Sequence, residues 1–217
     1  MELIAESLRL TFGKVHALED VSLCVPASSR LVLSGPAGGG KTSLLKCLAG
    51  LVSPSAGQVR WDGREVSALS TKERRAAQVA FGMVFQTDAL FDSMSVLENV
   101  LLPLRKRGVA EDEAKERAFE ALGQVGLKDA ALKRPEVLSG GMKKRAGVAR
   151  AIVARPVVLL ADDPFAGLDP VTQGSIASLL LEVSEGRTLI VALPYPVASL
   201  PVERQIRVVG GRLEAPG

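Results

Sequence analysis

The sequence contains few aromatic residues and only two cysteines, and both shortages narrow the class of protein. Aromatic residues are 4% of the 217 residues, so the core must be mainly aliphatic. Cys24 and Cys47 are too few for a disulfide framework, and we interpret both as small buried hydrophobic residues in a reducing compartment. Apolar residues at 47% and charged residues at 24% are typical of globular domains, which excludes a disordered or fibrous chain.

Long hydrophobic runs and a strong charge of one sign are also missing. No segment reaches the run of about 18 apolar residues that a membrane span needs; residues 189–198 come nearest and contain two prolines. Residues 1–6 carry acidic groups where a secretory signal would carry basic ones. We therefore expect a cytoplasmic protein, or one attached to a membrane only through a partner.

The charge balance gives little support to a nucleic-acid partner, and we expect none. There are 27 basic and 24 acidic residues, a formal net charge of +3, whereas nucleic-acid domains usually show a stronger basic excess. Basic residues gather only at 105–107 and 143–145. We interpret both groups as solvated helix ends.

Short apolar stretches around polar turns open the chain. Residues 3–5, 8–10 and 21–25 have the character of strands, with a polar turn at 13–14 and a hairpin end at 60–63. These patterns predict a small antiparallel β layer.

Near-continuous apolar runs follow at 31–33, 80–85, 157–161 and 188–192. Such runs are typical of parallel strands that are covered on both faces. The first leads into a glycine-rich turn and a predicted helix over 41–51, the order that opens an α/β unit. Residues 96–154 interrupt the strands with helical patterns, which predicts an inserted α-helical subdomain.

The glycine-rich turn fits the phosphate-loop pattern G-x-x-x-x-G-K-[ST]. Its glycines let backbone N–H groups surround phosphates, and the following helix N-terminus favours negative charge. The ammonium group of Lys41 reaches the β- and γ-phosphates, and the Thr42 hydroxyl is placed to ligate Mg²⁺. The predicted nucleotide-binding residues are Gly35, Pro36, Ala37, Gly38, Gly39, Gly40, Lys41, Thr42 and Ser43.

Two carboxylates follow the buried run 157–161. At the carboxyl end of a parallel strand, Asp162 is placed to hold Mg²⁺ directly or through water. Asp163 points differently and is our candidate for the residue that faces the attacking water. The structural alternative is that either acid only caps the turn before Pro164.

Further segments resemble the ATP-binding-cassette (ABC) ATPases. Residues 138–142, Leu-Ser-Gly-Gly-Met, are similar to the family's signature loop, and residues 167–169 are similar to its D-loop. Gln86 matches the Q-loop, and Phe12 stands where the family places an aromatic ring against adenine. The resemblance implies a P-loop NTPase (RecA-like) α/β core over 1–86 and 155–217 with an N-terminal antiparallel β layer. A helical subdomain over 87–154 would complete a single ABC ATPase domain.

The resemblance also implies cofactors, partners and residue roles. Two cassettes would form a head-to-tail dimer with ATP and Mg²⁺ between them, and Ser139, Gly140 and Gly141 of each would contact the partner's nucleotide. Gln86 would contribute to the Mg²⁺ site and to catalysis, together with Lys41 and Asp163. An integral-membrane permease would hold the cassette at the cytoplasmic face of the bacterial inner membrane.

A narrower resemblance concerns the ATPases of Mla-type lipid transporters. Residues 81–86, 89–96, Met142 and 164–172 are similar to those proteins. Such ATPases drive permeases that work with MCE-domain proteins to move phospholipids between bacterial membranes. Leu90, Phe91 and Met94 would then line a groove for a permease helix.

Two hydrolytic groups depart from the family pattern. The family usually has glutamate where this chain has Asp163, and a switch histidine where the aligned stretch has Leu193. A leucine cannot hydrogen-bond a γ-phosphate, and we interpret the single histidine, His16, as an exposed turn residue. We predict slow hydrolysis by a transport ATPase. One alternative is a hydrolysis-impaired, nucleotide-gated regulatory cassette, and another is the ATPase of an ABC exporter for another substrate. A third is a non-transport ABC ATPase, although the long coiled coils that are usual in that class are missing from this sequence.

Overall fold

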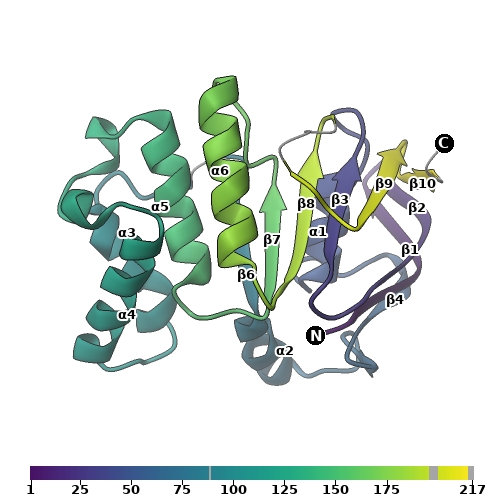
Figure 1. The fold of residues 1–217 in the computed structure, drawn as a ribbon. Coiled ribbons are helices and arrows are strands. Elements are labelled where there is room, and N and C mark those ends of the chain that lie inside the picture. The colour runs from purple at the N-terminus through teal and green to yellow at the C-terminus, as the bar shows by residue number, and fades with distance from the viewer. Residues whose placement is uncertain (88, 196–199, 215–217) are drawn as a thin grey trace.

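The computed structural model describes residues 1–87, 89–195 and 200–214, which form two sheets and the helices around them (Figure 1). An antiparallel sheet of four strands has the order β2-β1-β4-β5, and a second sheet of six strands has the order β10-β9-β3-β8-β7-β6. In the second sheet only β10 is antiparallel to its neighbour. Both the predicted antiparallel layer and the parallel α/β core are therefore present.

The antiparallel sheet is built from the strands expected at the start of the chain. The stretches 3–5 and 8–10 are one strand, because Ser7 with φ of 47° bends the chain without ending it. The turn at 13–14 joins β1 to β2, and Phe12 lies opposite Val15. The strands are β1 (Leu3–Phe12), β2 (Val15–Val25), β4 (Ala56–Trp61) and β5 (Arg64–Glu65).

The larger sheet contains the apolar runs as buried central strands. Every residue of β7 and β8 is buried, as expected for strands with both faces covered. The last two strands, β9 and β10, were not expected from the sequence. The strands are β3 (Arg30–Ser34), β6 (Phe81–Val84), β7 (Val158–Asp162), β8 (Thr188–Leu193), β9 (Arg204–Val209) and β10 (Arg212–Glu214).

Helices cover both faces of this sheet. In Figure 1, α6 lies in front of the sheet and α1 behind it, and a helical block (residues 96–152) stands at one side. The α-helices are α1 (Lys41–Leu48), α2 (Thr71–Ala77), α3 (Val96–Arg105), α4 (Glu111–Gln124), α5 (Gly140–Ile152) and α6 (Pro170–Val183). Short 3₁₀ turns are η1 (Gln78–Ala80), η2 (Lys128–Ala130) and η3 (Pro135–Val137).

The two faces of the sheet belong to two hydrophobic clusters. Successive strand residues point to opposite faces. Thus Leu189, Val191 and Leu193 of β8 pack with α5 and α6, whereas Ile190 and Ala192 pack with α1 and the antiparallel sheet. This alternation therefore determines which face of the sheet each strand residue occupies, including the last residues of each strand.

The single tryptophan joins the antiparallel sheet to the core. Trp61 is 3% exposed, and its indole N–H donates to the carbonyl of Leu48 at 2.8 Å. Its ring lies 5.0 Å from that of Phe81, centroid to centroid. Because Trp61 is buried at this junction, its fluorescence is a suitable reporter of unfolding.

Two expectations about surface residues were wrong. Cys24 is exposed, because its neighbours on β2, Leu23 and Val25, take the inward positions; only Cys47 is buried. The group 143–145 is not a solvated helix end: it lies inside α5, and Lys144 is 5% exposed. The other basic group does lie at the exposed end of α3, where Arg105 pairs with Glu111.

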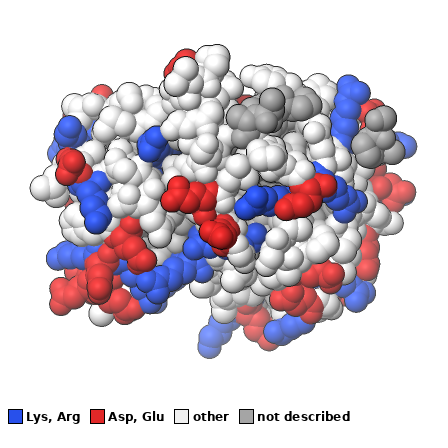
Figure 2. Space-filling model, in the orientation of Figure 1, with Lys and Arg blue, Asp and Glu red and all other residues white. Residues whose placement is uncertain are grey.

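The surface carries mixed charge. Figure 2 shows acidic and basic side chains intermixed over the face that Figure 1 presents. Within the described part of the chain, which excludes residues 196–198 of the apolar stretch noted above, no helix has the length and apolar character needed to cross a bilayer.

Candidate functional site

The phosphate loop connects β3 to α1 at the carboxyl edge of the larger sheet. Gly40, with φ of 105°, is the N-cap of α1, and Lys41 is the first residue of that helix. The Lys41 ammonium donates to the carbonyls of Gly35 at 2.6 Å and Pro36 at 2.8 Å. The loop therefore curls around the ammonium group directly at a helix N-terminus, which is the arrangement that binds phosphate.

Several positions of this loop must be glycine because neighbouring backbone leaves no room for a Cβ atom. A Cβ at Gly35 or Gly39 would lie 2.2 or 2.6 Å from the carbonyl oxygen of Val208 in β9, and a Cβ at Gly40 would lie 2.5 Å from that of Ala17 in β2. The sequence suggested only that glycines free the N–H groups for phosphate. The structure adds that the loop is packed between two strands, so larger residues cannot replace these glycines without moving the backbone.

The two acidic residues at the end of β7 point in different directions. The Thr42 hydroxyl donates to Asp162 Oδ1 at 2.9 Å, so these two predicted Mg²⁺ ligands are adjacent. Asp163 has φ of 42°, a left-handed conformation that turns its side chain away from that of Asp162. Its Oδ2 lies 3.5 Å from the amide nitrogen of Gln86. Asp162 thus contacts Thr42, and Asp163 contacts Gln86.

Burial and nearby charges shift the pKa values of two groups in the site. Burial raises the pKa of Asp163, and the Asp162 charge raises it further, while Lys144 and Lys41 act in the opposite direction. Burial also lowers the pKa of Lys41, against the effect of the two aspartates. The Asp163 carboxyl is therefore a better proton acceptor than an exposed aspartate.

One pocket of about 370 Å³ brings most predicted site residues together. This volume is within the range of small-molecule sites. Gly35 and Pro36 do not line the pocket and contribute through their contacts with Lys41. The lining residues are Phe12, Val15, His16, Ala17, Ala37, Gly38, Gly39, Gly40, Lys41, Thr42, Ser43, Gln86, Asp162, Asp163 and Pro194.

Four of these residues were missed by the sequence reasoning: Val15, His16, Ala17 and Pro194. His16 is exposed as expected, but it belongs to β2 and lies opposite Thr11, whose hydroxyl is 3.4 Å from its Nδ1. The hairpin was the available signal, because a turn at 13–14 brings the start of β2 against the end of β1, where Phe12 is predicted to contact the nucleotide.

The signature residues do not line this pocket. Ser139 caps α5 by accepting from the N–H of Met142 at 3.3 Å, and Gly140 and Gly141 form the first turn. A Cβ at Gly141 would lie 2.9 Å from the Thr172 side chain, so this turn packs beside the first turn of α6. Within one chain, these residues form a separate surface from the phosphate loop.

Leu193, aligned with the family's switch histidine, does not face the pocket. It is the last residue of β8, is 1% exposed and belongs to the cluster around α5 and α6. Pro194 lines the pocket instead. Pro196, the other proline of this stretch of the sequence, lies outside the described residues.

We therefore expect Leu193→His to destabilise the protein without improving its chemistry. The imidazole would be buried among apolar side chains, and a buried polar group without a partner costs about 1–3 kcal/mol. Thermal unfolding followed by Trp61 fluorescence measures this loss, with the volume-conserving Leu193→Met as control. Faster ATP hydrolysis at an unchanged unfolding temperature would show that the position does reach the nucleotide.

The oxygen donors of the pocket fit a nucleotide-bound Mg²⁺. The Thr42 hydroxyl, the Asp162 carboxylate and the amide oxygen of Gln86 are hard ligands of the kind that Mg²⁺ prefers. Among the described residues, no group of three or more His, Cys, Asp or Glu side chains could hold a metal ion by itself. In nucleotide sites Mg²⁺ is usually held by one or two protein groups together with phosphates and water.

Comparison with known families and structures identifies the class of protein. The sequence profile described as "ABC transporter" matches residues 18–166, and the chain belongs to this family. The dimeric structure of MJ0796, a bacterial ABC transporter cassette, superposes with a TM-score of 0.89 at 30% identity, covering 98% of this chain and 97% of that chain. A post-hydrolysis dimer of that cassette, bound to ADP and Pi, gives 0.88 at 29% identity with the same coverage. The ABC cassette fold is thereby confirmed.

Curated relatives carry names of transport ATP-binding proteins. Over 194 residues the chain is 41% identical to the methionine import ATP-binding protein MetN of Carboxydothermus hydrogenoformans, covering 87% of this chain and 58% of that protein. Over 178 residues it is 40% identical to the "Probable ribonucleotide transport ATP-binding protein mkl" of Mycobacterium tuberculosis, covering 82% and 50%. The chain spans about half the length of the curated relatives it matches. Neither name refers to lipid, so the Mla-type resemblance is not established by these relatives.

Proposed function

We propose that this chain is the ATP-binding and ATP-hydrolysing subunit of a bacterial ABC transporter, with a core over 1–86 and 155–217 and a helical subdomain over 87–154. One observation carries the proposal: a single pocket joins the phosphate loop to Asp162, Asp163 and Gln86. Steady-state release of phosphate from ATP by the purified chain tests it, and a rate equal to that of a phosphate-loop variant would refute hydrolysis.

Each group of the pocket has a role that its position supports. The N–H groups of the loop and the N-terminus of α1 bind phosphates, and Phe12 offers a ring face to the base. Mg²⁺, when bound, neutralises phosphate charge and orients the reacting group. Thr42 and Asp162 would hold it, and Gln86 would contact both the metal side and Asp163. Asp163 would orient the attacking water and accept its proton.

A second cassette would complete the site. Ser139 and Gly140 are exposed and lie away from the chain's own pocket, so a head-to-tail partner would bring its own copy of this surface to the nucleotide. The start of α5 is a helix N-terminus with two glycines, which suits close approach to a phosphate. The partner would be a second copy or a different cassette.

Ser139→Arg is expected to prevent ATP-dependent association and to spare nucleotide binding by the monomer. A long cationic side chain at this exposed position would block close contact with a partner's pocket. Light scattering with ATP and Mg²⁺ measures association, and Ser70→Arg is the matched control because Ser70 is also an exposed N-cap serine, on α2. Dimerisation of Ser139→Arg equal to that of the unaltered chain would contradict the sandwich arrangement.

The loop before α3 offers a surface for a permease. Phe91 is 54% exposed, whereas Leu90 packs against the helical core. The fully buried side chain of Asn99 organises the loop: its Oδ1 accepts from the N–H of Phe91 at 2.7 Å, and its Nδ2 donates to the Phe91 carbonyl at 3.1 Å. An ordered loop with an exposed aromatic ring is suited to line a groove that binds a helix of the permease. The cassette would thus be a peripheral protein at the cytoplasmic face of the inner membrane.

For the cargo we propose lipid, moved with an MCE-domain partner. The support is the similarity of residues 81–86, 89–96 and 164–172 and of Met142 to Mla-type ATPases. Purification of the tagged chain from membranes, with mass spectrometry of its partners, tests this proposal. An MCE-domain protein with a lipid permease would support it, and a methionine permease would contradict it.

A second candidate is a nucleotide-gated cassette that hydrolyses ATP too slowly for turnover to drive transport. It is favoured by the short Asp163 side chain and by the burial of Leu193 at the position of the switch histidine. Single-turnover hydrolysis with excess protein discriminates the two, because the gated cassette would bind ATP tightly and leave it intact.

A further inference from the structure

Side chains of helix α5 donate hydrogen bonds to the backbone of the segment that follows β6. The Lys144 ammonium, on a side chain that is only 5% exposed, donates to the backbone carbonyl of Gln86. Further along the same helix, the Arg150 guanidinium donates to the carbonyl of Ala89. Two cations of α5 therefore hold the backbone of the loop that carries the Gln86 side chain into the pocket.

Burial makes the Lys144 contact a strong constraint. A buried ammonium group must be hydrogen-bonded to offset its lost hydration, and bonds from charged donors are stronger than those between neutral groups. The Lys144 charge also acts on Asp163, the carboxyl beside the Gln86 amide. Lys144 does not line the nucleotide pocket. It therefore contacts the Gln86 backbone from outside the pocket lining.

The same helix begins at the signature residues. Ser139 is the N-cap of α5, and Lys144 lies just beyond its first turn. A hydrogen-bonded helix is rigid over this length, so the position of the Ser139 turn and that of the Gln86 backbone are mechanically joined.

We propose that Lys144 is a positioning residue that sets the Gln86 side chain against Asp163 and the Mg²⁺ side of the pocket, and this inference rests on the proposed ATP site. Lys144 would act on the Gln86 side chain through its hydrogen bond to the Gln86 carbonyl. Its removal would leave the phosphate loop intact and loosen the group that links metal and base.

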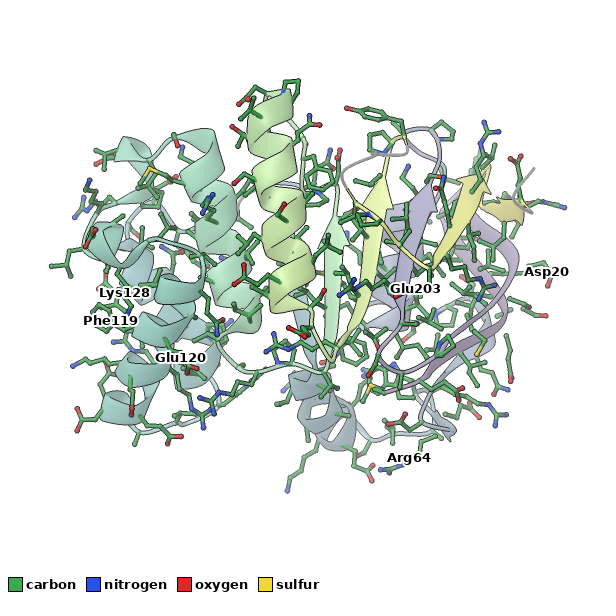
Figure 3. All side chains as sticks on the ribbon, in the orientation of Figure 1. Asp20, Arg64, Phe119, Glu120, Lys128 and Glu203 are labelled. Atoms are coloured by element: carbon green, nitrogen blue, oxygen red, sulfur yellow. The ribbon has the colours of Figure 1, made fainter. Side chains whose placement is uncertain are left out.

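The test measures binding, so it does not require hydrolysis. Affinity for a non-hydrolysable ATP analogue is measured with and without Mg²⁺ in Lys144→Met, Gln86→Ala and the double variant. We expect Lys144→Met to leave Mg²⁺-free affinity unchanged and to raise the Mg²⁺ concentration for half-maximal effect about tenfold. In the Gln86→Ala background it should add almost nothing, because groups that act through one another are not additive. Lys128→Met, which removes the same charge from the exposed surface of the helical block (Figure 3), is the control.

A chemical rescue separates positioning from folding. Lys144→Cys in a Cys24→Ser background, alkylated with 2-bromoethylamine, restores an ammonium group at nearly the original reach. Mass spectrometry selects protein that is modified once, at position 144, before binding is measured. Cys47 is buried and its thiol pKa is raised to about 11, and the Cys24→Ser parent treated in the same way reports any modification there. Alkylation should return the Mg²⁺ dependence to that of the Cys24→Ser parent, with Trp61 fluorescence showing that each protein is folded.

Several results would overturn the inference. Additive effects of Lys144→Met and Gln86→Ala would show that Lys144 acts elsewhere, and so would a loss of Mg²⁺-free affinity in Lys144→Met. Failure of alkylation to restore a folded Lys144→Cys protein would show that the ammonium group is not what matters. If the unaltered chain binds no nucleotide, the proposed function fails and the inference fails with it.

Discussion

Lys41→Ala is expected to lower the affinity for ATP at least tenfold while the fold stays intact. The ammonium group lies between the phosphate loop and the two aspartates, and among the described residues Lys41 is the one lysine or arginine that lines the pocket. Hydrogen bonds to charged groups contribute about 1.5–3 kcal/mol, which corresponds to roughly 10- to 150-fold in affinity. Without Lys41, Asp162 and Asp163 would also repel the phosphates.

The fold should tolerate this substitution because Lys41 packs little of its side chain in the core. Helix α1 is anchored by Leu44, Leu45 and Leu48, all fully buried, and alanine is the best helix former. Isothermal calorimetry measures the affinity. Lys46→Ala is the matched control, since it removes the same charge from the last turn of the same helix, outside the pocket. Unchanged affinity in Lys41→Ala would refute the assignment of the phosphate loop.

The central part of the fold could be predicted from the sequence because its signals are local. The runs that form β3, β7 and β8 are apolar throughout, so burial on both faces was visible in the residues themselves. In contrast, β9 is a half-buried strand in which exposed residues interrupt the apolar ones, and its place in the sheet depends on pairing with the distant strand β3. No local signal reports such a pairing.

The candidate site divides in the same way. The phosphate loop and the two aspartates were found from chemistry that depends on sequence spacing. The packing of Val208 and Ala17 against the loop, the burial of Leu193 and the contact between Lys144 and Gln86 depend on elements far apart in the chain. The basic residues at 143–145 suggested a solvated surface. The sequence does not show that the backbone carbonyl of Gln86 is placed to accept a hydrogen bond from Lys144 inside the fold.

The second large effect is expected at Asp163, where we predict opposite changes for two substitutions. Asp163→Asn removes the proton acceptor while keeping nearly the same shape, and it should lower hydrolysis by about 10²-fold or more, in the range of general-base contributions. Asp163→Glu should instead raise hydrolysis about tenfold. Steady-state phosphate release measures both, with Lys41→Ala as the blank.

The reason for the increase is a matter of reach. The contact from the Gln86 amide to Asp163 Oδ2 is 3.5 Å, longer than the usual 2.9–3.0 Å for such bonds. One added methylene extends the carboxylate by about 1.5 Å, and a misplacement of about 1 Å can cost 10²-fold in rate. A tenfold gain needs only about 1.4 kcal/mol of the barrier, so a partial improvement in geometry is enough to be measured.

Backbone strain at residue 163 should lower the stability of the Asp163→Glu variant without changing the predicted gain in its hydrolysis rate. Asp163 has φ of 42°, where aspartate is tolerated better than glutamate, so Asp163→Glu should unfold at a slightly lower temperature. That cost is shared by the ground state and the transition state, and it cancels from the barrier as long as the protein is folded. A folded Asp163→Glu variant whose hydrolysis is unchanged or slower would show that Asp163 is not a shortened base. The chain would then either use aspartate competently or serve as a nucleotide-gated cassette, and the rate left in Asp163→Asn decides between these two.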